Sequence, residues 1–409
     1  MTVVVLGGGL IGLSSALELL QDGHQVVVVD GERLGSGATP GNAGWVCPSQ
    51  VGPLAAPGML RHSAGLLLKP SSPLWIAPTA NPAMLRFLLA FARRCNRRDH
   101  RRATEALVAL AGSVEEDYAR LQDRLGSSFT RQRDGVLCCY TDATHARSAH
   151  ESWHKVARVS GTGPGPLLAA EAMAAEEPAL SAGVSAGFVL PQDSHVDPSA
   201  LASALRTAVE AAGATVVENA GACTLLRTSD RVTGVRTTHA GDQLADEVVV
   251  AAGAGSAAYL RDLGVRVPMV PGTGYSFSVA PSAVPRRPLH LEEAHVACTP
   301  LSGTLRVAGT MEISRRQHGI NRRRVEAIAR AASRYLRDVD WEARTDVWGG
   351  PRPVTSDGLP LLGRPSGLAG CVVATGHGMY GVTLAPTTGR LVAALVRGET
   401  GHEAVSPNR

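Results

Sequence analysis

The chain has 409 residues, of which 44% are apolar and 19% charged, a composition typical of one large or two medium folded domains rather than of a disordered protein. The net charge of +4 is small and the arginines are scattered, so we expect no nucleic-acid partner. Seven cysteines without CxxC or Cys/His metal spacing predict reduced thiols, no metal and a cytoplasmic protein. No uncharged run is long enough to span a membrane, and a first strand beginning at Thr2 leaves no room for a signal peptide.

Three glycines follow the first predicted strand, the continuous apolar run of residues 3–6. Gly7, Gly9 and Gly12 have the GxGxxG spacing. The first glycine permits a tight turn, the second lets a pyrophosphate approach the backbone, and the third lets a helix pack on the strand. A helix that begins here directs its free backbone N–H groups toward the phosphates. The pattern predicts a dinucleotide site.

A helix with an apolar stripe follows and stops near Gly23, and a second buried strand over residues 26–29 ends at Asp30. An acid about 20 residues beyond the glycines can accept hydrogen bonds from a ribose, and it would repel the 2′-phosphate of NADP. The sequence therefore indicates NAD or FAD. Residues 246–260 fit a second nucleotide motif only loosely, and we expect them to form a returning strand of the same domain.

The stretch GHGMYGVTLAPTTG, residues 376–389, follows a predicted strand at 371–374 and leads into a predicted helix at 385–396. A glycine-rich junction between strand and helix directs backbone N–H groups toward negative charge. A reduced flavin carries such charge at one edge of its ring, so this junction favours FAD over NAD. Small residues at 35–44 let the backbone run along the same extended ligand. We expect His377 near the flavin; the alternative is a structural histidine that caps the helix.

Six motifs spread nearly from end to end: VLGGGLIG…D, GSGATPGNAG, PLAAPG, QDSHVDP, WGGPRPVTSDGLPLLG and ATGHGMYGVTLAPTTG. Together they resemble the D-amino acid oxidase/dehydrogenase superfamily of FAD enzymes, and within it the bacterial D-amino acid dehydrogenases. The resemblance implies that hydride passes from the Cα of an amino acid, first of all a D-amino acid, to flavin N5, and that the imino acid hydrolyses to a 2-oxo acid. The acceptor of the electrons, a quinone or dye or O₂, stays open.

Two other functions are compatible with the same motifs. One is the oxidation of a secondary amine or cyclic imino acid of the proline, hydroxyproline, sarcosine or glycine type. The other is a flavin-binding subunit without turnover of its own. We expect the FAD to be bound non-covalently, although Cys47 and Cys298 stay open as linkage sites.

The resemblance also implies the fold class: an α/β, Rossmann-like FAD-binding domain interleaved with an α+β substrate domain on a mixed or antiparallel sheet. We assign residues 1–60, 185–265 and 345–409 to the FAD-binding domain. Residues 61–184 and 266–344 form the substrate-binding domain.

An apolar helix is predicted over residues 83–92. We expect it to pack inside its domain, and the alternative is a peripheral contact with a membrane surface through Phe87, Leu88 and Phe91.

Candidate site residues follow from these assignments. A bidentate Arg suits a planar carboxylate, and the family places an Arg in this role at the position of Arg352 in GGPRPVT. Tyr275, Tyr380 and His295 are further candidates for contact with the substrate, each with core packing as the alternative. The predicted FAD-binding residues are Gly7, Gly9, Leu10, Ile11, Gly12, Asp30, Gly31, Ser36, Gly37, Ala38, Asn42, Ala43, Gly44, Ala252, Gly253, Gly376, His377, Gly378, Met379, Tyr380, Gly381, Val382 and Thr383.

Overall fold

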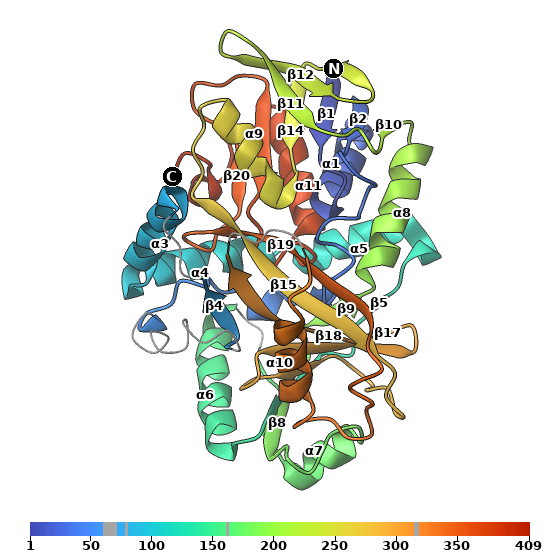
Figure 1. Cartoon of the computed structure of the whole chain (residues 1–409), viewed down its shortest axis with the longest axis vertical. Coiled ribbons are helices and arrows are strands. Elements are labelled where there is room, and N and C mark those ends of the chain that lie inside the picture. Colours follow the sequence, from blue (N-terminus) through green and yellow to red (C-terminus); the bar gives the residue numbers. More distant parts are fainter. Residues whose placement is uncertain (60–71, 78–80, 161–162, 315–318) are drawn as a thin grey trace.

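The computed structural model describes residues 1–59, 72–77, 81–160, 163–314 and 319–409. In this part of the chain the strands form two large sheets, one above the other in Figure 1, and two small ones.

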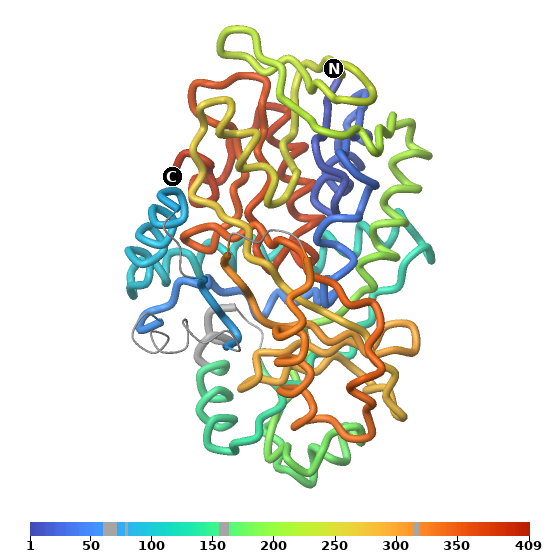
Figure 2. The backbone as a smooth tube through the Cα atoms, viewed as in Figure 1, coloured from blue at the N-terminus to red at the C-terminus, as the bar shows by residue number. Residues whose placement is uncertain are grey.

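The first large sheet is the upper one in Figure 1, and its strand order is β10-β2-β1-β14-β21-β20. Five neighbouring strands run parallel, and β20 joins the edge antiparallel. The strands are β1 (Thr2–Leu6), β2 (Gln25–Val29), β10 (Thr215–Val217), β14 (Glu247–Val250), β20 (Leu361–Gly363) and β21 (Cys371–Thr375). Both ends of the chain therefore meet in one sheet, as Figure 2 shows by the blue and red segments of its upper half.

Both faces of this sheet are covered, which explains why its strands have no polar alternation. On β1, Val3 and Val5 pack toward helices, whereas Val4 and Leu6 pack toward the opposite cover. The helices on the first face are α1 (Leu10–Gln21), α8 (Pro198–Ala211) and α11 (Ala385–Val396), backed by α4 (Arg97–Ala111) and α5 (Val114–Leu125). The opposite cover consists of α9 (Ser256–Asp262) and the antiparallel strands β11 (Cys223–Thr228), β12 (Arg231–Thr237) and β13 (Gly241–Leu244).

The second large sheet has the order β19-β15-β18-β17-β16-β6-β8-β7, and β4 pairs with β18. Most of its pairs are antiparallel; β16–β6 and β18–β4 are parallel. Its strands are β4 (Leu74–Ile76), β6 (Val136–Tyr140), β7 (Leu168–Ala169), β8 (Ala186–Leu190), β15 (Met269–Val279), β16 (Leu289–Leu291), β17 (Val296–Leu301), β18 (Thr304–Ile313) and β19 (Thr345–Thr355). Helices α6 (Ala143–Ser160), α7 (Ala170–Glu176) and α10 (Arg322–Ala332) accompany it. A small sheet of β3 (Trp45–Val46), β9 (Ser194–Val196) and β5 (Arg131–Gln132) completes the strands.

The predicted fold class is confirmed, and two of the predicted domain segments include strands of the second sheet. The sequence assigned β8 and β19 to the FAD-binding domain, whereas both strands pair within the second sheet. The physical reason lies in long-range pairing: β19 follows β15 over residues 345–355, and β8 pairs with β6. The division into two domains itself stays a prediction, and part of its second segment lies outside the described residues.

Helix α3 (Pro82–Arg94) matches the apolar helix predicted at 83–92, and Asn81 caps its amino terminus. Its Phe87 and Phe91 are buried against the end of the second sheet, as the packing interpretation expected. Leu85 and Leu89 on its other side remain 45% and 59% exposed. Among the described residues, no helix has both the length and the apolar character needed to cross a membrane.

Candidate active site

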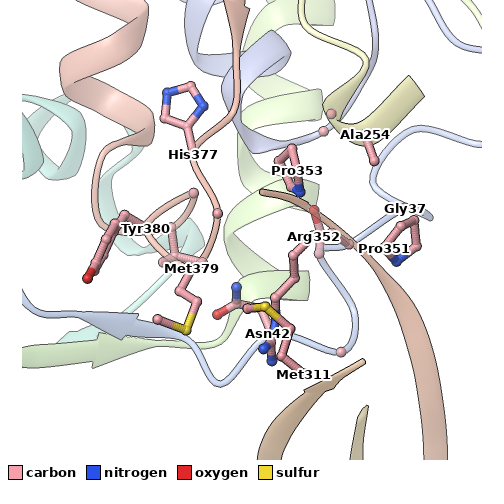
Figure 3. Close-up of a pocket in the computed structure, with 18 of the residues that line it drawn as sticks. Gly37, Asn42, Ala254, Met311, Pro351, Arg352, Pro353, His377, Met379 and Tyr380 are labelled. Atoms are coloured by element: carbon pink, nitrogen blue, oxygen red, sulfur yellow. The ribbon is translucent and has the colours of Figure 1, made fainter. Parts of the chain in front are cut away.

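A cavity of about 1020 Å³ is lined by residues from both chain ends and from the second sheet. Figure 3 shows part of its lining, with Arg352 and Pro351 on one side and the loop of His377 to Tyr380 on the other. The volume reaches the upper end of the range for ligand pockets, which suits an extended cofactor together with a small substrate.

The turn after β1 meets one end of this cavity. Gly7 adopts φ +115 against the backbone of Ala251, a position that a side chain could not share. Gly9, the residue before α1, lines the cavity, and nothing lies within 4 Å of the place where its Cβ would be. No side chain caps α1 and no acid lies in its first turn. The helix N-terminus can therefore receive a phosphate from the cavity side.

Asp30 follows β2 at the edge of this turn and also lines the cavity. Its Oδ2 accepts a hydrogen bond from Gly8 N at 2.7 Å, and its Oδ1 accepts one from Glu32 N at 3.0 Å. Burial raises the pKa of this carboxyl group, although the two backbone donors oppose the rise. The backbone thus fixes the orientation of Asp30 and leaves lone pairs for ribose hydroxyls. Glu32 lines the cavity beside it, and the sequence analysis missed this residue.

The loop after β21 presents mainly backbone to the cavity. His377 turns its ring away from it (Figure 3): Nε2 lies 2.9 Å from Thr388 Oγ1 in α11, and burial lowers the pKa of the imidazole to about 4. His377 is therefore a neutral histidine whose ring binds Thr388 of α11, while the residue itself lines the cavity. Its place near the flavin stays a prediction. Met379, 48% exposed, extends into the cavity instead.

Neither predicted tyrosine presents its hydroxyl to the substrate space. The Tyr380 hydroxyl donates to Gly52 O at 2.6 Å and accepts from Gly52 N at 2.9 Å. Tyr275 is buried outside the cavity lining and donates to Glu312 Oε2 at 2.9 Å. Both hydroxyls thus join distant segments of the fold, as the packing alternative expected.

Arg352 on β19 lines the cavity and forms no ion pair with any described carboxylate. Its Nη1 donates to Thr310 O at 3.2 Å, and its guanidinium lies over Gly274, where an added Cβ would approach Cζ to 2.5 Å. Burial lowers the pKa of Arg352 to about 10, so the side chain remains a cation at neutral pH. A half-buried cation in the cavity wall that lacks an acidic partner can pair with an anion of the ligand.

Thr310 was not predicted, but it shapes the position of Arg352. It lies at φ +55, opposite a register shift between β15 and β18, and its hydroxyl has no hydrogen-bond partner among the described residues. A β-branched residue in this region is strained, and such strain collects at functional sites. Polar and apolar residues alternate without a break in TMEI, so no local pattern in the sequence marked this position.

Two histidines line the cavity at the edge formed by β16 and β17. His295, which was predicted, lies at φ +51 and is exposed to the cavity, so it is not a satisfied core histidine. Its enclosure and the neighbouring His290 lower the pKa of His295. His290 was missed; its ring meets Trp45 edge to face at 5.3 Å, and Trp45 Nε1 donates to Thr299 Oγ1 at 2.8 Å.

Cys47 lines the cavity, whereas Cys298 is buried away from it. Burial raises the pKa of both thiols, which keeps them protonated at neutral pH. A protonated thiol is a poor nucleophile, and non-covalent attachment of FAD stays a prediction. Among the described residues, one group brings three possible metal-donor atoms within 4.8 Å of one another: Cys138, His290 and Glu292. We assign no metal to it, because His290 and Glu292 already pair with each other.

Most of the predicted FAD-binding residues line the cavity: Gly7, Gly9, Leu10, Ile11, Asp30, Gly31, Ser36, Gly37, Ala38, Asn42, Ala43, Ala252, Gly253, His377, Gly378, Met379, Tyr380, Gly381, Val382 and Thr383. Gly12, Gly44 and Gly376 do not, because each packs against protein that a Cβ would strike: Gly7 O, Val196 O and Thr355 respectively.

The glycines of the cavity lining also fit an extended ligand such as FAD. A Cβ would meet no atom within 4 Å at five of the lining glycines, Gly9, Gly37, Gly253, Gly378 and Gly381. At these five positions the cavity wall is bare backbone with open space in front of it. A long ligand can lie against this wall of exposed backbone.

Comparisons with known proteins agree with this site. A family model described as FAD dependent oxidoreductase (DAO) matches residues 2–395. A D-amino acid dehydrogenase of Cereibacter sphaeroides is 33% identical over 97% of this chain and 92% of its own, and D-amino acid dehydrogenase 2 of Ralstonia nicotianae is 34% identical over 100% and 99%.

Among solved structures, glycine oxidase from Geobacillus kaustophilus superposes with a TM-score of 0.76 at 23% identity and covers 100% of this chain and 98% of its own. L-proline dehydrogenase from P. horikoshii gives 0.70 at 19% identity, with 100% and 97% covered. At these identities the two structures show a shared fold. Together with the family match and the full-length relatives, they establish that the chain belongs to the DAO family of FAD-dependent oxidoreductases and oxidises amino acids with FAD.

Proposed function

We propose that this chain oxidises a free D-amino acid at its Cα–N bond to an imino acid, which water converts to a 2-oxo acid and ammonia. The observation that carries the proposal is Arg352, a half-buried cation in the cavity wall without an acidic partner among the described residues. The full-length relatives, which are D-amino acid dehydrogenases, support the D configuration.

Arg352 binds the substrate carboxylate through its guanidinium N–H groups. The carbonyl of Thr310 holds Nη1 and thereby limits the rotation of the guanidinium plane. A carboxylate held by two parallel hydrogen bonds has a fixed orientation, which places Cα at one point of the cavity. FAD, when bound, supplies the two-electron acceptor.

No carboxylate base lines the substrate end of the cavity in the described residues. The lining carboxylates are Asp30 and Glu32, and both belong to the dinucleotide turn. The substrate must therefore react with its amine already neutral, because the amine lone pair drives the departure of hydride. Positioning by Arg352, rather than proton abstraction by a side chain, is the contribution of this chain to the rate.

The test is anaerobic reduction of the holoenzyme with D-amino acids, L-amino acids, glycine, proline and N-alkyl glycines. D-Amino acids should bleach the flavin fastest, and Arg352→Ala should retain FAD while reduction slows about 100-fold or more. Arg236→Ala is the control, since Arg236 pairs with Asp242 on a distant hairpin. An unchanged rate in Arg352→Ala would show that Arg352 does not bind the substrate carboxylate. Reduction by N-alkyl glycines alone would show that the substrates are secondary amines rather than D-amino acids.

We further propose a quinone or dye, rather than O₂, as the electron acceptor, on the support of the dehydrogenase relatives. The substrate-reduced enzyme should consume O₂ slowly and reduce a quinone analogue rapidly. Rapid O₂ consumption would make the chain an oxidase. Acid precipitation should leave the flavin colour in the supernatant, and a yellow pellet would show a covalent link.

A further inference from the structure

A row of small side chains leads across the second sheet from the neighbourhood of Arg352. Ala308, Ala297 and His290 are direct register partners on β18, β17 and β16, and all three line the cavity. Neighbouring strands lie about 4.8 Å apart, so His290 lies about 10 Å from Ala308 across the sheet. Two methyl side chains leave room above the sheet, and His290 is the first large polar group along the row.

The row begins beside Arg352, the residue that we propose binds the substrate carboxylate. Thr310, whose carbonyl accepts from Arg352, lies two residues from Ala308 on the same strand. A substrate whose α-carboxylate pairs with Arg352 can therefore extend its side chain over Ala308 and Ala297 toward His290.

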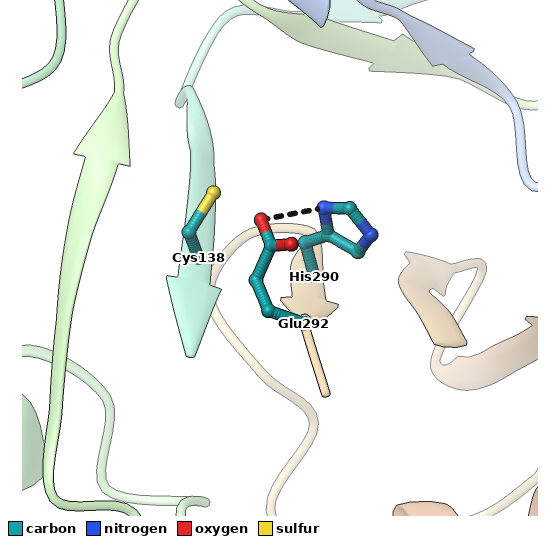
Figure 4. Close-up of side chains that lie close together, drawn as sticks. All are labelled: Cys138, His290 and Glu292. Carbon is teal, nitrogen blue, oxygen red and sulfur yellow. Dashed lines mark ion pairs between the residues drawn. The ribbon is translucent and has the colours of Figure 1, made fainter. Parts of the chain in front are cut away.

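His290 is held in one orientation. Its Nδ1 lies 3.0 Å from Glu292 Oε1, and Trp45 packs edge to face against the ring. Figure 4 shows the second ring nitrogen on the side away from Glu292, and Cys138, which is fully buried, lies on the other side of Glu292. Among the described residues, no hydrogen bond engages Nε2. With Nδ1 facing a carboxylate, an imidazolium offers the Nε2–H as a donor.

Basic side chains, and no carboxylate of the described residues, line this end of the cavity. Arg352, His290 and His295 line it, whereas Glu292 is not part of the lining. The lining carboxylates of the described residues, Asp30 and Glu32, face the dinucleotide end. The substrate end thus offers cationic and N–H donor groups, which match an anion rather than an ammonium or an alkyl group.

We infer that His290 forms a subsite for a second carboxylate, so that the preferred substrates are acidic D-amino acids with D-glutamate foremost. The substrate class rests on the function proposed above, but the subsite can be tested without turnover. The two carboxylates would be divided between Arg352 and His290, with the carbon chain over Ala308 and Ala297.

The first experiment measures binding to the oxidised holoenzyme by the change in flavin absorbance. Glutarate, with two carboxylates, should bind about 10-fold or more tightly than butyrate, with one, because a charge-assisted hydrogen bond contributes that much. His290→Leu should abolish this preference, His290→Gln should keep part of it through its amide donor, and His402→Leu, at an exposed site near the carboxy terminus, should leave it unchanged. Equal affinities for glutarate and butyrate in the wild type overturn the subsite.

The second experiment compares reduction by D-glutamate and by D-norvaline, which has a methyl group in place of the second carboxylate. The ratio of their kcat/KM values should exceed one in the wild type and fall about 10-fold in His290→Leu. A ratio below one with no glutarate preference overturns the subsite while the oxidation of D-amino acids stands. A glutarate preference that depends on His290, without reduction by any D-amino acid, supports the subsite and rejects the proposed substrate class.

Discussion

At the scale of single residues, His377 shows how a side chain in a binding loop can serve the fold. Its ring is 4% exposed and paired with Thr388, while the backbone of the same loop faces the cavity. Burial lowers the imidazole pKa from 6.5 to about 4, so between these pH values the unfolded chain binds a proton that the folded chain does not. The contribution of neutral His377 is thus complete above the unfolded pKa and is lost as pH falls toward 4, by about 1.4 kcal/mol per pH unit.

This linkage predicts the behaviour of His377→Gln. The variant should melt below the wild type at about pH 7.5, and the difference should shrink at about pH 5, because Gln binds no proton in either state. Thermal unfolding of the holoenzyme at the two pH values measures it, with His402→Gln as the exposed control. A difference that does not depend on pH would show that His377 is not held neutral by burial.

At the scale of elements, the crossing of α1 and α11 connects the two halves of the cofactor site. Gly389 in α11 packs on α1 so closely that a Cβ would lie 2.6 Å from Ser14 O. The residues before α1 and the loop before α11 both line the cavity. The distance between the two helices therefore sets the distance between the two ends of the FAD site.

Gly389→Ala should separate these helices. We expect it to destabilise the fold by about 1–3 kcal/mol, as overpacking does, and to weaken FAD binding. Gly112→Ala is the matched control, since Gly112 has helical φ and its Cβ would meet backbone oxygens only at 3.4 Å and beyond. Denaturant unfolding and FAD titration of the apoprotein measure both effects. Normal FAD affinity in a destabilised Gly389→Ala would show that the crossing does not set the site.

Elements with local signals were predictable from the sequence, and contacts between strands were not. Helix α11 has the predicted bounds, 385–396, because a glycine-rich turn and an apolar stripe mark it within one short segment. Arg352 was identified through its segment, and the cavity places it in the wall. His290 and Thr310 were missed, since their roles depend on register across strands and on a bulge, which no local pattern encodes.

At the scale of the whole molecule, one ligand would contact segments from the first strand to the loop before the last helix. The cavity lining runs from Leu6 to Thr383 and includes strands of both large sheets. A ligand that binds the folded state alone stabilises it by about 2.7 kcal/mol at 100 times its Kd. For a chain of this length that corresponds to a rise in Tm of about 3 °C.

Removal of FAD should therefore lower the Tm, and added FAD should restore it in proportion to the logarithm of its concentration. FMN lacks the adenosine half of FAD and should raise the Tm much less. With FMN, the turn that contains Gly9 and Asp30 would not bind the adenosine-side phosphate and ribose. Differential scanning calorimetry of the apoprotein with each flavin measures this. Equal stabilisation by FMN would mean that the amino-terminal turn does not bind the nucleotide, and the assignment of that end of the cavity would fail.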